Sequence, residues 1–178
     1  MRTDVYALAF CLTSKNMILI GLGSNVAGPW GSPRQAVLRA LRELGGNGTQ
    51  LLAASRLIAT SPYGKKNQPG YVNAVARIAT HMPPEALMRR LHAIERRAGR
   101  RRGVRWGPRT LDLDLLDYHG RCMGKPGRLT LPHPGIVDRQ FVLKPIAEIA
   151  PAWIHPVARR GARALLRRLD GHAGGSEI

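Results

Sequence analysis

The segment Leu111-Asp112-Leu113-Asp114-Leu115 constrains the fold more than any other part of the chain. Side chains of a β-strand alternate between two faces, so residues two apart share a face at a spacing of ~6.6 Å along the strand. The three leucines therefore share one face and the two aspartates the other. The pattern predicts a strand over residues 110–118 that packs its leucines into a core and presents two carboxylates opposite. Asp117 is out of phase and is expected to end the strand.

Two interpretations of the paired carboxylates remain open at this point. Neighbouring carboxylates repel unless a cation lies between them, and oxygen ligands of this kind select Mg²⁺ or Ca²⁺. Such a pair can hold two Mg²⁺ ions together with substrate phosphates. Two solvated aspartates on an exposed sheet face would give the same alternation. The preceding Arg105, Trp106 and Arg109 favour phosphate chemistry, because arginine forks bind phosphate and an indole stacks on planar rings.

The remaining pattern predicts an α+β fold. Apolar runs predict strands over residues 17–22, 51–60 and 71–80, and a shorter one over 128–131. Ser32, Pro33 and Gln35 form a capping-box pattern that begins a helix ending at Gly45, and Pro84 begins a second helix. Residues 96–105 are expected to form a basic loop, and 141–149 and 162–169 to be helical. The order β-α-β-β-α-β is typical of a ferredoxin-like split βαβ arrangement, a mainly antiparallel sheet flanked by helices.

Composition limits the class of protein. The chain has 178 residues, which suits one domain over 17–178 preceded by an extension of unclear role over 1–16. No run approaches the ~18–20 apolar residues of a membrane span. Two cysteines are too few for a disulfide framework, so a cytoplasmic location without membrane attachment is expected. Residues 5–12 imitate a short signal peptide, but no small-residue cleavage site follows.

A formal charge of +17 predicts a polyanionic partner, and several classes of protein would fit it. A nucleic-acid-binding ferredoxin-like module would display base-stacking aromatics on its sheet, whereas the strand at 110–118 displays carboxylates. A two-metal nuclease or nucleotidyl transferase could use the same aspartates. The common phosphate loops are absent: the stretch from Gly21 to Val26 begins like a dinucleotide fingerprint but lacks the final glycine.

Several motifs occur together in a fixed order. They are Gly23-Ser24-Asn25, Gln68-Pro69-Gly70-Tyr71-Val72-Asn73-Ala74, Ile94-Glu95 with Gly99-Arg100, Arg105-Trp106-Gly107-Pro108-Arg109-Thr110-Leu111-Asp112-Leu113-Asp114, and Leu131-Pro132-His133-Pro134 followed by Arg139 and Phe141. In this order the sequence resembles the 6-hydroxymethyl-7,8-dihydropterin pyrophosphokinase family of folate biosynthesis. The resemblance covers about residues 17–156, and the run that ends at Asp114 is its most specific part.

The resemblance implies a reaction and a role for each matched residue. ATP would donate its β,γ-pyrophosphate to the pterin hydroxymethyl group and leave as AMP. Asp112 and Asp114 would hold two Mg²⁺ ions, and Arg100 and Arg109 would join them as catalytic residues. The pterin would be bound by Thr60, Pro62, Tyr63, Tyr71, Asn73 and Phe141. ATP would be bound by Glu95, Arg102, Trp106, Leu115, Arg128, Thr130, His133 and Arg139. The expected partners are these two small molecules, with no nucleic acid, and the chain is expected to be a monomer.

Overall fold

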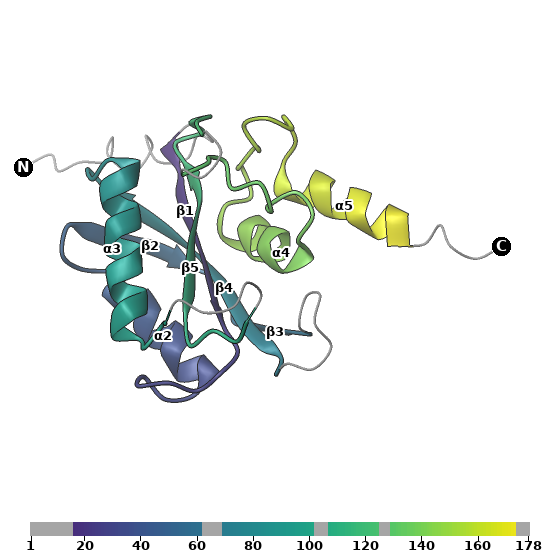
Figure 1. The fold of residues 1–178 in the computed structure, drawn as a ribbon. Helices are drawn as coiled ribbons and strands as arrows, with labels where there is room; N and C mark the ends of the chain where they lie inside the picture. The colour runs from purple at the N-terminus through teal and green to yellow at the C-terminus, as the bar shows by residue number, and fades with distance from the viewer. Residues whose placement is uncertain (1–15, 62–68, 102–106, 125–128, 174–178) are drawn as a thin grey trace, which may run out of the picture.

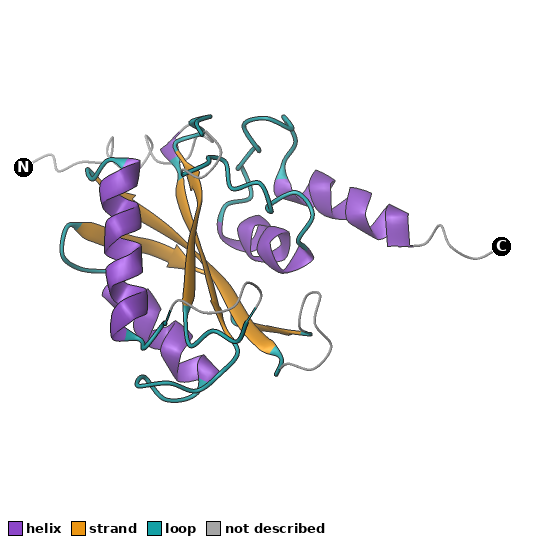
Figure 2. Ribbon diagram, viewed as in Figure 1, coloured by secondary structure: helices purple, strands orange, loops and turns teal. Residues whose placement is uncertain are grey.

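An antiparallel β-sheet runs through the middle of the molecule, as the computed structural model shows (Figures 1 and 2). The structure describes residues 16–61, 69–101, 107–124 and 129–173, with residues 171–173 described as backbone alone. The sheet follows the order β2-β4-β1-β5, and β3 pairs with β4 beside that path. Its strands are β1 (Ile18–Ser24), β2 (Thr49–Ala54), β3 (Ile58–Thr60), β4 (Tyr71–Thr80) and β5 (Asp112–Tyr118).

Helices cover both faces of this sheet. The described helices are α2 (Pro33–Glu43), α3 (Pro84–Arg97), α4 (Gln140–Ile149) and α5 (Ala162–Ala173). Figure 1 shows α2 and α3 on one side of the sheet and α4 and α5 on the other. Leu111, Leu113 and Leu115 are buried in the core beneath α2 and α3, whereas Leu116 packs into a second core beneath α4. The predicted ferredoxin-like α+β class is confirmed, and so is the leucine face of the acidic strand.

Two elements, α2 and β4, occur where the local sequence pattern predicted them. Ser32 caps α2 through the capping box with Gln35, and Pro33 occupies its first turn. The predicted strand over residues 71–80 coincides with β4. Among the described residues no helix is long and apolar enough to cross a membrane.

The strand expected over residues 51–60 was wrong in its continuity, because the chain forms β2 and β3 with a break between them. Ser55, in the break, donates its backbone N–H to the carbonyl of Val75, while its Oγ accepts the Val75 N–H at 3.0 Å. The side chain thus replaces a backbone carbonyl in the ladder. The chain turns at this point and re-enters the sheet at Ile58.

The prediction that Asp117 ends the strand was wrong, because β5 continues through Tyr118. The register of β5 against β1 shifts between Leu115 and Asp117, so that Leu116 is an extra residue in a bulge. Asp117 is fully buried, and its carboxylate accepts hydrogen bonds from Trp153 Nε1 at 2.6 Å and Gly120 N at 2.9 Å. Burial raises the pKa of this carboxyl, and the two hydrogen bonds oppose that rise.

Two further expectations need correction. The basic loop expected from Arg96 begins later, because α3 continues through Arg97. The short strand expected over residues 128–131 is not formed by the described part of that segment, where Leu131 makes an isolated bridge with Met123. Arg128 lies outside the described residues.

Candidate active site

A pocket of about 380 Å³ opens on the α4 side of the sheet. Its floor is strand β1, which contributes Gly21 and Gly23 to this face. Antiparallel partners share a face, and Gly23 stands between Asn73 of β4 and Asp112 of β5, while Gly21 pairs with Asp114. The pocket is lined by Gly21, Leu22, Gly23, Thr60, Ser61, Tyr71, Asn73, Ala74, Arg109, Asp112, Asp114, Leu116, His133, Arg139, Phe141 and Val142.

The two glycines were not recognised as site residues from the sequence, although their spacing carried the signal. Glycines two apart on a strand leave one face without side chains. A Cβ at Gly23 would lie 3.1 Å from Asn73 Oδ1, and one at Gly21 would lie 3.3 Å from a Leu116 methyl carbon. The missing side chains therefore provide the depth of the pocket between β4 and β5.

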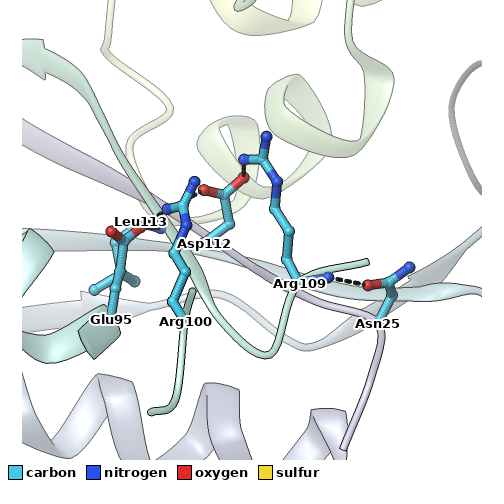
Figure 3. A network of polar contacts seen from close by, with 6 residues as sticks. All are labelled: Asn25, Glu95, Arg100, Arg109, Asp112 and Leu113. Carbon is cyan, nitrogen blue, oxygen red and sulfur yellow. Dashed lines mark hydrogen bonds and ion pairs between the residues drawn. The ribbon is translucent and has the colours of Figure 1, made fainter. Parts of the chain in front are cut away.

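Asp112 is held by two arginines (Figure 3). Its Oδ2 pairs with Arg109, and its Oδ1 lies 2.6 Å from Arg100 Nη1 in an ion pair that lacks hydrogen-bond geometry. Burial opposes the charge of Arg109, but the charge and hydrogen bond of Asp112, together with the charges of Asp114 and Tyr71, outweigh burial and raise the pKa of that guanidinium. Arg109 and Asp112 thus form a charged edge of the pocket, and Arg100 stands behind Asp112.

Asp114 differs from its neighbour. Among the described residues its carboxylate accepts no hydrogen bond and forms no ion pair. Burial, followed by the negative charge of Asp112, raises the pKa of Asp114, although His133 and Arg139 act in the opposite direction. A half-buried carboxylate that lacks a partner beside a second carboxylate has the donor chemistry of a divalent cation site.

Glu95 of α3 lies behind this edge, not in the pocket. Its side chain is 4% exposed, and Oε1 accepts the backbone N–H of Leu113 at 2.7 Å and pairs with Arg100 (Figure 3). Burial raises the pKa of Glu95 to about 7, against the opposing effects of the Leu113 hydrogen bond and Arg100. Glu95 therefore fixes Arg100 and strand β5 relative to α3.

Ser24 and Asn25 of the Gly-Ser-Asn motif position the site from outside the pocket. Asn25 accepts the backbone N–H of Arg109 at 2.8 Å and donates to the carbonyl of Pro69 at 3.3 Å, while Ser24 Oγ donates to the carbonyl of Thr110 at 2.7 Å. These bonds attach the segments before β4 and β5 to the end of β1. The sequence flagged this motif only as part of the family resemblance.

Four of the six expected pterin residues line the pocket. Asn73 is buried, and its Nδ2 donates to Thr60 Oγ1 at 2.8 Å. Tyr71 and Phe141 also line the pocket, from β4 and α4, and partial burial raises the pKa of the Tyr71 hydroxyl. Pro62 and Tyr63 lie outside the described residues.

The residues expected to bind ATP are only partly brought together. His133 and Arg139 line the pocket, and His133 Nδ1 accepts the N–H of Gly135 at 3.0 Å. Thr130 is exposed outside the pocket lining, and the side chain of Leu115 is buried in the core, 2% exposed, because it points to the leucine face of β5. Arg102, Trp106 and Arg128 lie outside the described residues.

A sequence profile of the family described as 7,8-dihydro-6-hydroxymethylpterin-pyrophosphokinase (HPPK) matches residues 19–151 of the chain. The chain belongs to the HPPK family. It is 43% identical to the 2-amino-4-hydroxy-6-hydroxymethyldihydropteridine pyrophosphokinase of Pseudomonas aeruginosa, an alignment that covers 75% of this chain and 80% of that HPPK. With the enzyme of the same name from Methylorubrum extorquens it shares 36% identity over 85% of this chain and 92% of that one.

Some HPPK relatives are much longer than this chain. The folic acid synthesis protein fol1 of Pneumocystis carinii is 33% identical over 87% of the chain, which spans 20% of that protein. The solved HPPK-DHPS triple mutant of Plasmodium falciparum superposes with a TM-score of 0.72 over 92% of this chain and 45% of its own. The sequence identity there is 12%, so this likeness supports the HPPK fold alone.

Proposed function

We propose that this chain transfers the β,γ-pyrophosphate of ATP to the hydroxymethyl oxygen of 6-hydroxymethyl-7,8-dihydropterin in folate synthesis. The observation that carries the proposal is a single pocket in which an aromatic and amide end meets a charged edge at Asp112. In the reaction the hydroxymethyl oxygen bonds to the β-phosphorus, the bond from that phosphorus to the AMP oxygen breaks, and the hydroxyl proton is released.

The aromatic end suits a flat heterocycle. Tyr71 and Phe141 supply ring faces, and the amide of Asn73 supplies a donor and an acceptor to the edge of a pterin. Because Thr60 already accepts one N–H of Asn73, the amide is held in one orientation. Pterin is therefore expected to bind between the two rings with its polar edge toward Asn73.

The charged edge suits the triphosphate. Arg109 and Arg139 face the pocket, and Arg100 stands behind Asp112, so positive charge surrounds the place where negative charge moves toward the leaving AMP. Arginine forks bind phosphate oxygens in fixed directions. Glu95 holds Arg100, and Asn25 holds the backbone of Arg109. We therefore expect catalysis by positioning and electrostatic stabilisation.

The residues present fit a magnesium site. The carboxylates of Asp112 and Asp114 share one face of β5. Burial disfavours the charge of Asp114, and a bound cation would stabilise that charge. Two carboxylates supply only part of an octahedral shell, which leaves positions for phosphate oxygens and water. Bound Mg²⁺, for which we expect two ions, would neutralise the phosphates and orient them for in-line attack.

The test is an assay of the purified chain with ATP, the pterin and Mg²⁺, analysed for nucleotide and pterin products. We expect AMP and pterin pyrophosphate in equal amounts, with no AMP when the pterin is omitted. ADP as product, or AMP formation without pterin, would overturn the proposal. Full activity in excess chelator would overturn the metal assignment alone.

A further inference from the structure

A second cavity, of about 620 Å³, lies between β3 and the layer of α4 and α5. We call it the β3–α4 groove. It shares no residue with the pocket described above. The groove is lined by four apolar and four charged residues. The apolar residues are Leu57, Ile58, Pro145 and Ala147, and the charged residues are Arg56, Lys144, Glu148 and Arg163.

The charges of the β3–α4 groove are unbalanced. Its carboxylate, Glu148, already accepts the backbone N–H of Arg56 at 3.2 Å and pairs with Arg56 Nε at 3.3 Å. Lys144 and Arg163 are exposed, and neither forms a hydrogen bond or ion pair with a described residue. An excess of two positive charges beside apolar surface therefore faces solvent, and complementary charge determines which partners associate with such a surface.

The Glu148–Arg56 contact is itself an example of how the groove holds a carboxylate. One oxygen of Glu148 takes both a main-chain and a side-chain donor of Arg56, whose side chain is 87% exposed. An ion pair this exposed contributes little to stability. Arg56 therefore remains accessible to an incoming carboxylate, beside Lys144 and Arg163.

Strand β3 adds backbone recognition. It has three residues, Ile58, Ala59 and Thr60, and among the described strands it pairs only with β4. Among the described residues, the edge away from β4 takes no backbone hydrogen bond, so an extended segment can pair with its N–H and C=O groups by strand addition. Figure 1 shows β3 beside the lower end of β4, below α4 in that view. The residues that line the groove come from the segment that enters β3, from α4 and from α5.

We propose that the β3–α4 groove binds an extended acidic segment of a partner protein that carries apolar side chains at alternate positions. Its carboxylates pair with Lys144, Arg163 and Arg56, and its apolar side chains cover Leu57 and Ile58. A nucleic acid would use the cations but leave the apolar floor uncovered. A second copy of this chain is disfavoured because two chains of charge +17 repel each other.

The experiment measures anisotropy of a fluorescein-labelled dodecapeptide that alternates Glu or Asp with Leu or Val, at ~0.1 M salt, where distant charges are screened. We expect saturable binding that weakens at least ~10-fold in the Lys144→Glu/Arg163→Glu double variant, a loss equal to ~1.4 kcal/mol. The matched control is Arg34→Glu/Arg89→Glu, two exposed arginines on α2 and α3, which should bind like the parent. Unchanged thermal melting and an unchanged kcat at saturating ATP verify that both variants are folded.

Several results would overturn the proposal. One is the absence of saturable binding, and another is equal binding of a peptide with lysine in place of every acidic residue. An equal loss in the control variant would show a general charge effect. Binding of an oligouridylate of the same charge with the same dependence on Lys144 and Arg163 would make the groove a polyanion site. A dimer in light scattering that dissociates in the double variant would make it a self-association surface.

Discussion

At the residue scale, the two aspartates of β5 differ although the sequence presents them as equals. Asp112 has both oxygens beside arginines, whereas Asp114 lacks a charged partner among the described residues and is desolvated. Alternation predicted that they share a face. It could not predict that Asp112 pairs with two arginines, because Arg100 reaches Asp112 only through the fold, although Arg109 lies just three residues before Asp112.

Replacing Asp114 should separate activity from stability. Asp114→Asn is expected to lower kcat at least ~100-fold, the scale of losing one electrostatic contact to a transition state. Its melting temperature without metal should equal or exceed that of the parent, since the substitution removes a desolvated charge beside Asp112. Steady-state assays and thermal melts in chelator measure the two effects. Melting well below the parent would contradict the assignment of Asp114 as an unpartnered carboxylate.

Glu95 should make stability depend on pH. Its folded pKa of about 7 lies above its ordinary value of 4.5, so the folded state binds the proton more tightly. The stability from that proton is fully present below pH 4.5 and is lost as pH rises through 7. The shift corresponds to about 3 kcal/mol of folding stability. The parent is expected to lose this stability as pH rises, whereas Glu95→Gln, which does not titrate, is not.

Urea unfolding of the parent and Glu95→Gln across this pH range measures the difference. Glutamine retains an oxygen for the N–H of Leu113, so the comparison isolates the charge. Parallel stability profiles for the two proteins would mean that Glu95 is charged throughout and that Arg100 outweighs its burial.

At the element scale, β1 serves as the floor of the pocket because its α4-facing positions near the end are glycines. Gly23→Ala is expected to raise the KM for the pterin about tenfold or more, because the new methyl group would lie 3.1 Å from Asn73 Oδ1 and displace the amide. Gly46→Ala is the matched control, since a Cβ there meets nothing within 4 Å. Kinetics with varied pterin at saturating ATP provide the measurement. An unchanged KM would place the pterin elsewhere.

Elements set by neighbours in sequence were predictable, and those set by distant contacts were not. The beginning of α2 depends on Ser32 and Gln35, three residues apart, so its capping box was visible in the sequence. The break between β2 and β3 depends on Ser55 bonding to Val75, twenty residues away. The bulge at Leu116 likewise places Asp117 against Trp153. No local pattern specifies either partner.

At the scale of the whole molecule, burial makes the surface more basic than the composition suggests. Four acidic residues have low exposure or contribute to the site: Glu95, Asp112, Asp114 and Asp117. With a net charge of +17, the molecule is therefore surrounded by a positive field. A field of this sign concentrates anionic ligands and weakens as salt screens it.

The two substrates should respond differently to ionic strength. ATP is polyanionic and the pterin is neutral, so the KM for ATP is expected to rise several-fold between ~0.03 and ~0.3 M KCl at constant free Mg²⁺, while the KM for the pterin changes less than ~2-fold. The Arg34→Glu/Arg89→Glu variant changes two exposed side chains on α2 and α3. The KM for ATP should rise less in this variant because it carries less positive charge. Equal rises for both substrates would instead indicate that salt acts on the enzyme itself, for example on the ion pairs of Asp112 with Arg100 and Arg109.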